Sequence, residues 1–143
     1  MANICEIPMI NASNEDVRNI LKSSKIIAIV GLSSNPDKPS NQVAKFLKDH
    51  GYTIVPVNPT TDELLGEKCY PTLSAIPFDI DIADVFRRPE DIPSVADDAI
   101  SKGVKVFWMQ EGIANNAAAD KLRAAGITVV MDRCTKKEYM AHM

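Results

Sequence analysis

Apolar residues in this chain fall into short unbroken runs that are separated by amphipathic stretches. Five runs are predicted to be strands, at Ile26–Val30, Ile54–Val57, Ile80–Phe86, Val104–Trp108 and Ile127–Met131. A continuous apolar run indicates a strand that is covered on both faces, which is typical of a parallel sheet between two layers of helices. The third run alternates in part, so we predict a less central place for it.

The stretches between the runs have the 3.6-residue period of helices that bury one face. Two apolar stripes are clear, and they consist of Ile92, Val95, Ala96, Ala99 and Ile100, then Ala114, Ala117, Ala118, Leu122 and Ala125. A weaker helix begins near Pro39. An N-terminal helix at about 13–23 starts with Ser13-x-x-Asp16, which resembles a capping box.

Three helical patterns end at a glycine that directly precedes a strand, at Gly51, Gly103 and Gly126. Glycine enters the left-handed conformation of a helix C-terminus without a clash from Cβ. Repeated junctions of this kind predict an α/β, Rossmann-like fold, with an open parallel sheet of about five strands and helices on both faces. We expect one domain over residues 1–143, with its core at about 25–134.

Composition favours a soluble cytoplasmic protein. The 143 residues are 45% hydrophobic and carry a net charge of −3, which argues against a general nucleic-acid binder. No apolar run approaches the ~20 residues that span a bilayer, and the N-terminus does not resemble a secretory signal. The three cysteines, Cys5, Cys69 and Cys134, suggest neither a disulfide framework nor a zinc site.

Loops that follow the strands are the places to look for a ligand, because open parallel sheets bind ligands outside the carboxyl ends of their strands. The first loop, GLSSNPDKPS, offers amides, hydroxyls and a helix N-terminus to a diphosphate, although a plain connecting turn explains it equally well. The second, Asn58-Pro59-Thr60-Thr61, has no carboxylate for the ribose 2′-hydroxyl of NAD. Coenzyme A (CoA), with its ribose 3′-phosphate, fits this pattern, and NADP remains possible.

The motifs on this edge resemble, in order, those of the CoA-binding protein family of small stand-alone domains. They are IVGLSSNPDKPS, GYTIVPVNP, LLGEKCYPTL, DVFRRPEDIP, VFWMQEGI and VVMDRC, and they extend over about residues 26–134. That family is similar to the CoA-binding N-terminal domain of the succinyl-CoA synthetase α-subunit. The resemblance implies a module that binds CoA or an acyl-CoA as a carrier, sensor or partner subunit.

By this resemblance each loop meets one part of CoA. The diphosphate is expected at Gly31, Leu32, Ser33, Ser34 and Asn35, and the adenosine at Val57, Asn58 and Pro59. The nucleotide and the start of pantetheine are expected at Phe86, Arg87, Arg88 and Pro89, and the pantetheine arm with its thiol at Trp108, Met109, Gln110, Glu111 and Gly112. The synthetase has lysines where this chain has Thr60 and Thr61. The cation for the 3′-phosphate is therefore expected from Lys38, beside Pro39, or from Arg87 or Arg88.

Catalysis by the chain alone is not indicated. The second domain of the synthetase, with its phosphorylated histidine, is absent, and we interpret His50 and His142 as solvated surface residues. The alternatives to a binding module are an NADP-dependent oxidoreductase and the CoA-binding half of an acyl-CoA ligase or transferase that another chain completes. A homodimer is compatible with so small a domain.

Two further side chains at this edge are candidates for chemistry. Cys134 follows the last strand among cationic neighbours, which lower the pKa of a thiol, so a mixed disulfide with CoA is one hypothesis and an inert buried thiol is the favoured alternative. Glu111 is interpreted as a cap of the following helix or as an orienting group rather than as an acid or base. Cys69 is assigned to packing.

Overall fold

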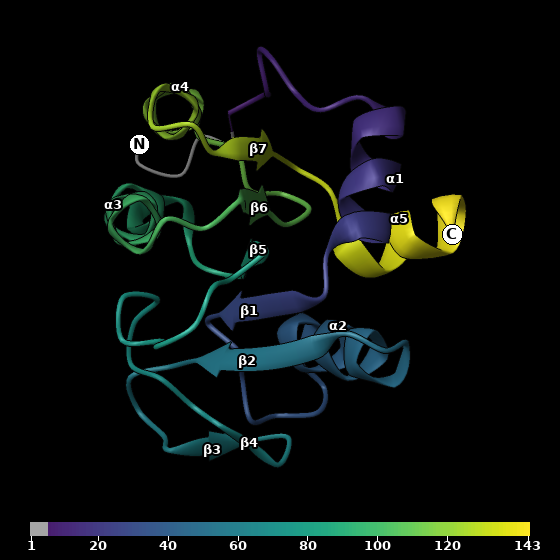
Figure 1. Cartoon of the computed structure of the whole chain (residues 1–143), viewed down its shortest axis with the longest axis vertical. Coiled ribbons are helices and arrows are strands. Elements are labelled where there is room, and N and C mark those ends of the chain that lie inside the picture. The colour runs from purple at the N-terminus through teal and green to yellow at the C-terminus, as the bar shows by residue number, and fades with distance from the viewer. Residues whose placement is uncertain (1–5) are drawn as a thin grey trace.

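The structure, a computed structural model, describes residues 6–143, so Cys5 lies outside the described part. Its centre is a parallel sheet of five strands in the order β2-β1-β5-β6-β7 (Figure 1). The strands are β1 Ile26–Val30, β2 Thr53–Val57, β5 Ile82–Val85, β6 Val106–Met109 and β7 Thr128–Val130, and a small hairpin of β3 Glu63–Leu64 and β4 Glu67–Lys68 lies outside the sheet. The Rossmann-like prediction is confirmed.

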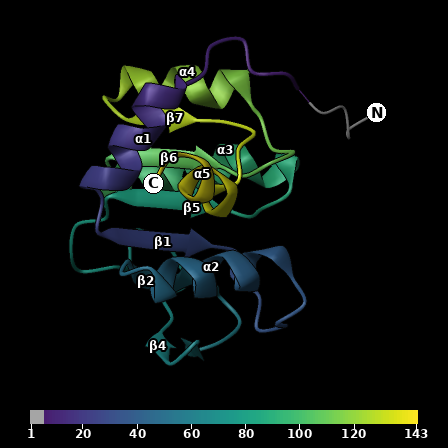
Figure 2. The ribbon, with the colours of Figure 1, turned by 90° about the vertical axis from the view of Figure 1, so that its right-hand side faces the viewer.

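Helices cover both faces of the sheet (Figures 1 and 2). One layer contains α1 Asn14–Ser23, α2 Pro39–Asp49 and α5 Thr135–His142; the other contains α3 Ile92–Lys102, which follows a 3₁₀ turn at Pro89–Asp91, and α4 Asn116–Ala124. Each layer encloses its own hydrophobic cluster against the sheet. No helix within residues 6–143 is both long and apolar enough to cross a membrane.

Strand β5 corrects one prediction, because it lies in the middle of the sheet rather than near its margin. The partial alternation of IDIADVF comes from half-buried Asp81, just before the strand, and from Asp84, whose side chain is fully buried. Its register partners are Ile29 in β1 and Trp108 in β6, both of which are buried as well. A polar residue inside a covered strand therefore imitated the pattern of a half-exposed one.

The helix ends follow the predicted chemistry, but one stripe does not. Ser13 and Asp16 form the capping box of α1, and Gly103 ends α3 at φ +79°. In α4, however, Ala117 and Ala125 are exposed, and the buried face consists of Ala118, Ala119 and Leu122. Ala114, the first residue of the predicted stripe, is buried but lies before the helix, which begins after its cap Asn115.

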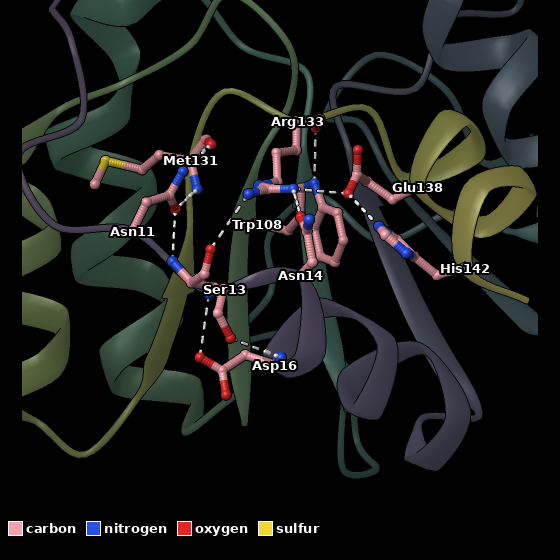
Figure 3. A network of polar contacts seen from close by, with 10 residues as sticks. Asn11, Ser13, Asn14, Asp16, Trp108, Met131, Arg133, Glu138 and His142 are labelled. Atoms are coloured by element: carbon pink, nitrogen blue, oxygen red, sulfur yellow. Dashed lines mark hydrogen bonds and ion pairs between the residues drawn. The ribbon is translucent and has the colours of Figure 1, made fainter.

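Helix α5 was not predicted, because its sequence TKKEYMAH has no apolar stripe. Its Tyr139 ring packs edge-on against Phe46 and Tyr52. Polar contacts add to this: the Arg133 guanidinium donates to Asn14 Oδ1 (3.0 Å) and to Glu138 Oε1 (2.8 Å), and the Trp108 indole donates to the Arg133 carbonyl (2.8 Å; Figure 3). His142 pairs with Glu138 (3.3 Å) and is only 22% exposed, so its interpretation as a solvated residue was wrong. His50 is exposed, as expected, and stacks on Phe46.

Candidate functional site

The strand order places a topological switch point between β1 and β5. From β1 the chain continues to β2 on one side, whereas β5 begins the half of the sheet on the other side. Ligands of open parallel sheets bind where the connections diverge in this way. The residues at this point are Gly31, directly after β1, and Phe86 and Arg87, directly after β5.

Two cavities flank the switch point at this edge, and a smaller one of about 260 Å³ is lined by Phe86, Arg87, Arg88 and Asp91. The first, of about 490 Å³, brings together nine of the predicted residues, namely Gly31, Ser33, Lys38, Pro39, Phe86, Arg87, Arg88, Gln110 and Glu111. The second, of about 400 Å³, contains Val57 and Pro59 and is closed by Ser94, Val95 and Asp98 of α3. Gly31 and Arg87 line both, so one extended ligand can occupy the two cavities and cross between them.

Gly31 allows the end of β1 to lie against the end of β5. Its φ is +87°, and a Cβ atom added there would lie 2.7 Å from the carbonyl oxygen of Phe86 and 2.8 Å from Cδ of Arg87. Any other residue would therefore be strained and would also collide with the backbone at the end of β5.

The loop between β1 and α2 is fixed by its own polar groups. The N–H of Ser33 donates to Ser40 Oγ (2.9 Å), the N–H of Asn35 donates to Ser33 Oγ (3.1 Å), and the Asn41 amide donates to the Ser33 carbonyl (2.9 Å). Lys38, the N-cap residue of α2, makes no side-chain capping bond. The positive end of the α2 dipole is therefore free to meet an anion at the first cavity.

Several predicted residues support the site from outside the cavities. Leu32 and Met109 are fully buried in the core, and Asn58 donates to the Leu32 carbonyl (2.9 Å) and accepts from the N–H of Thr60 (2.8 Å). The predicted residues that line neither cavity are Leu32, Ser34, Asn35, Asn58, Pro89, Trp108, Met109 and Gly112. Further lining residues were not predicted, and these are Val30, Ser40, Val43, Pro71, Thr72, Ser94, Val95, Asp98 and Ile113.

The two candidate arginines differ in their surroundings. Arg87 is 39% exposed, lines both cavities and lies 3.5 Å from Asp91. Arg88 is 73% exposed, lines the first cavity but not the second, and pairs with Asp91 at 3.3 Å and with Glu90 at 3.8 Å. Arg87 is therefore the cation that is placed for a ligand crossing the switch point.

Glu111 does not cap α4, because the cap is Asn115, which accepts from the N–H of Ala118 (2.9 Å). That interpretation was wrong. Glu111 instead pairs with Lys137 at 2.8 Å, which raises the pKa of the lysine and holds the carboxylate at the rim of the first cavity. An ion pair between side chains 26 residues apart leaves no local sequence signal.

The cysteines have separate environments. Half-buried Cys134 lines the first cavity immediately before α5, and its mixed disulfide with CoA stays a prediction. Cys69 is buried, and its thiol lies 3.4 Å from the Asn58 carbonyl; burial raises the pKa of this thiol, which agrees with a packing role. No cluster of three or more metal-ligating residues occurs within residues 6–143.

A buried carboxyl group lies beneath the first cavity. Asp84 accepts from the Gln110 amide and from the Thr135 hydroxyl (2.9 Å), and Gln110 also donates to Thr135 (3.0 Å). Desolvation raises the pKa of Asp84 to about 7, although the two hydrogen bonds act in the opposite direction. The sequence signal was an Asp inside an apolar run, but its partners lie 26 and 51 residues away.

Comparison with known proteins decides the family. The model of the CoA binding domain family matches residues 25–140. The chain belongs to this family. An uncharacterized protein, YneT of Bacillus subtilis (strain 168), is 47% identical over 128 residues, which are 90% of this chain and 95% of that protein. A solved hypothetical protein from Pyrococcus horikoshii OT3 has a TM-score of 0.89 and 40% identity, and the match covers 95% of this chain and 96% of the other.

This CoA binding domain is also homologous to part of a larger protein. It is 35% identical over 83 residues to acetate–CoA ligase [ADP-forming] II of Archaeoglobus fulgidus, a match of 57% of this chain and 12% of the ligase. The domain thus corresponds to a small part of such ligases. The family assignment gives no support to the oxidoreductase alternative.

Proposed function

We propose that the domain binds CoA or an acyl-CoA across the two cavities and acts as a binding module without catalysis of its own. The observation that carries this proposal is the pair of cavities that meet at Gly31 and Arg87, on the switch point of the sheet. Their volumes of about 490 and 400 Å³ suit the two arms of an extended ligand.

The arms of CoA are assigned by the chemistry of each cavity. The diphosphate crosses at Gly31, where β1 and β5 approach closely, and meets the N-terminus of α2, which no side chain caps. The adenosine occupies the second cavity beside Val57 and Pro59, and the pantetheine arm occupies the first, beside Gln110 and Ile113. Arg87 and Lys38 supply the positive charge for the phosphates.

Thermal unfolding in the presence of nucleotides tests this function. A ligand at a hundred times its Kd stabilises the folded state by about 2.7 kcal/mol, so CoA is expected to raise the melting temperature by several degrees. NADP is the control, and it is expected to leave the melting temperature unchanged. Equal shifts with both nucleotides, or none with CoA, would contradict the proposal.

A second candidate is the CoA-binding part of an acyl-CoA ligase or transferase that another chain completes, and the match to a small part of a CoA ligase favours it. Neither His50 nor His142 lines the cavities, so a phosphorylated histidine for such chemistry has to come from the partner. Affinity capture with the tagged full-length chain tests this candidate: recovery of an ATP-binding or acyl-transfer chain supports it, and recovery of the chain alone contradicts it.

A further inference from the structure

We propose that Asp84 and Thr135 are positioning residues that hold the Gln110 side chain so that its carbonyl oxygen faces the first cavity and accepts a hydrogen bond from an amide N–H of the pantetheine arm. This inference rests on the proposed function, since it names one contact that the arm makes. It concerns three side chains from β5, the end of β6 and the start of α5.

The orientation of Gln110 follows from the chemistry of its partners. Its amide nitrogen donates one hydrogen to Asp84 and the other to Thr135 Oγ1 (3.0 Å). The Thr135 hydroxyl uses its own hydrogen on the second oxygen of Asp84 (2.9 Å). An ionised carboxylate only accepts hydrogen bonds, so the nitrogen of Gln110 and not its oxygen has to face it.

The remaining polar atom, Oε1 of Gln110, reaches the cavity. The residue is only 5% exposed, yet it lines the first cavity. Within the described residues, every fully buried side-chain nitrogen or oxygen has a hydrogen-bond partner, and no donor among them bonds to Oε1. The small exposed part of Gln110 therefore includes an acceptor that is directed at the ligand space.

Rigid surroundings keep this acceptor in place. Asp84 belongs to the central strand, and Thr135 is the first residue of α5. The bonds of Arg133 to Asn14 and Glu138 fix the start of α5 immediately before Thr135 (Figure 3). An acceptor that is held by buried bonds selects a donor at one position and disfavours an acceptor there.

Protonation of Asp84 reverses the arrangement. A protonated carboxyl has to donate its hydrogen, and Gln110 can accept it only by turning its oxygen away from the cavity and presenting its NH₂ group to the ligand. The raised pKa of Asp84, about 7, brings this change close to neutral pH. An arm N–H would then meet another donor, so binding weakens as the pH falls.

Charged groups on the surrounding elements are directed elsewhere. Strands β1 and β6 contain no titratable residue, and all charged residues of α1 and α2 are exposed. On α5, Lys136 lies over the Phe46 ring, Lys137 pairs with Glu111, and Glu138 pairs with Arg133. At the cavity, Cys134 precedes Thr135, and Arg87 and Arg88 pair with Asp91.

Calorimetric titration separates this contact from CoA binding as such. At pH 8, Gln110→Leu is expected to weaken CoA binding by about tenfold, the value of one hydrogen bond, and to leave 3′-phosphoadenosine 5′-diphosphate, which lacks the arm, unchanged. Asp84→Asn supplies the second readout: from pH 8 to pH 6 the CoA affinity of the wild type is expected to fall about tenfold more than that of the variant.

Each result bears on one proposal. Failure of wild-type protein to bind CoA overturns the proposed function. If CoA binds but Gln110→Leu binds it as the wild type does, or weakens CoA and the arm-free nucleotide equally, the acceptor role is overturned. Parallel pH profiles for wild type and Asp84→Asn overturn the role of Asp84. If one variant does not fold, the other still tests the part of the proposal that it addresses.

Discussion

At the residue scale, six glycines of the chain share a positive φ, but Gly31 differs from the rest in what surrounds it. A Cβ at Gly31 would lie 2.7 Å from a backbone carbonyl, whereas at Gly126, with φ +85°, it would have nothing within 4 Å. Backbone strain alone thus acts at Gly126, and strain together with a steric clash acts at Gly31. The pair separates the two effects.

Substitution of the two glycines by alanine tests the close approach of β1 and β5. We expect Gly126→Ala to lower the free energy of unfolding by about 1 kcal/mol and Gly31→Ala by about 3 kcal/mol, because the clash adds to the strain. Urea denaturation measures both. CoA binding is expected to be lost only in Gly31→Ala, and equal losses of stability would contradict the described approach.

The arginines allow a test with an internal control. Arg87→Gln is expected to weaken CoA binding by about tenfold, because Arg87 lines both cavities where the phosphates cross. Arg88→Gln is expected to change the affinity by less than about twofold, because its side chain is 73% exposed. Titrations at low and high salt measure the effect, and a larger loss for Arg88→Gln would reverse the assignment.

Sequence reasoning found residues whose type alone signals their chemistry. Gly31, Arg87 and the loop after β1 were identified in this way, and the structure brings them together. Asp84 and Thr135 were not identified, because a buried hydrogen-bond network joins residues 51 positions apart. The Glu111–Lys137 pair was missed for the same reason, since tertiary contacts between side chains leave no periodic pattern.

At the element scale, strands and helices that bury an apolar face were predictable, and α5 was not. The five strands of the sheet lie within or next to the predicted runs, because covered strands concentrate apolar residues. Of the eight residues of α5 only Thr135 is fully buried, so its sequence shows no periodic stripe of apolar residues. The helix depends on Arg133 and on contacts with α1 and α2, which the chain order alone does not specify.

The capping box of α1 provides an element-scale prediction. Ser13→Ala removes the acceptor for the N–H of Asp16 (3.0 Å) and is expected to lower the free energy of unfolding by about 1 kcal/mol. Ser101→Ala, a change at an exposed position of α3, is the matched control and is expected to cost less than about 0.5 kcal/mol. Equal midpoints in urea for the two variants would contradict the capping role.

At the scale of the whole molecule, Asp84 links stability to pH. Its pKa is raised from 3.8 to about 7, so between these values the folded state holds a proton that the unfolded state has released. The free energy of unfolding of the wild type is therefore expected to fall as the pH rises, by at most about 1.4 kcal/mol per pH unit. Asp84→Asn is expected to lack this slope. Denaturation curves recorded from pH 4 to 8 measure the free energy of unfolding of both proteins. The same pH dependence in the wild type and the variant would contradict the raised pKa of Asp84.

The central claim is that CoA crosses the carboxyl ends of β1 and β5, where the chain connections run to opposite sides of the sheet. Backbone amide chemical shifts during a titration with CoA test it most directly. We predict that the perturbed amides lie in residues 31–40, 57–59, 86–88 and 110–113, together with the first turns of α3. No perturbation, or perturbations confined to the opposite edge, where β1 and β2 begin, would contradict the account.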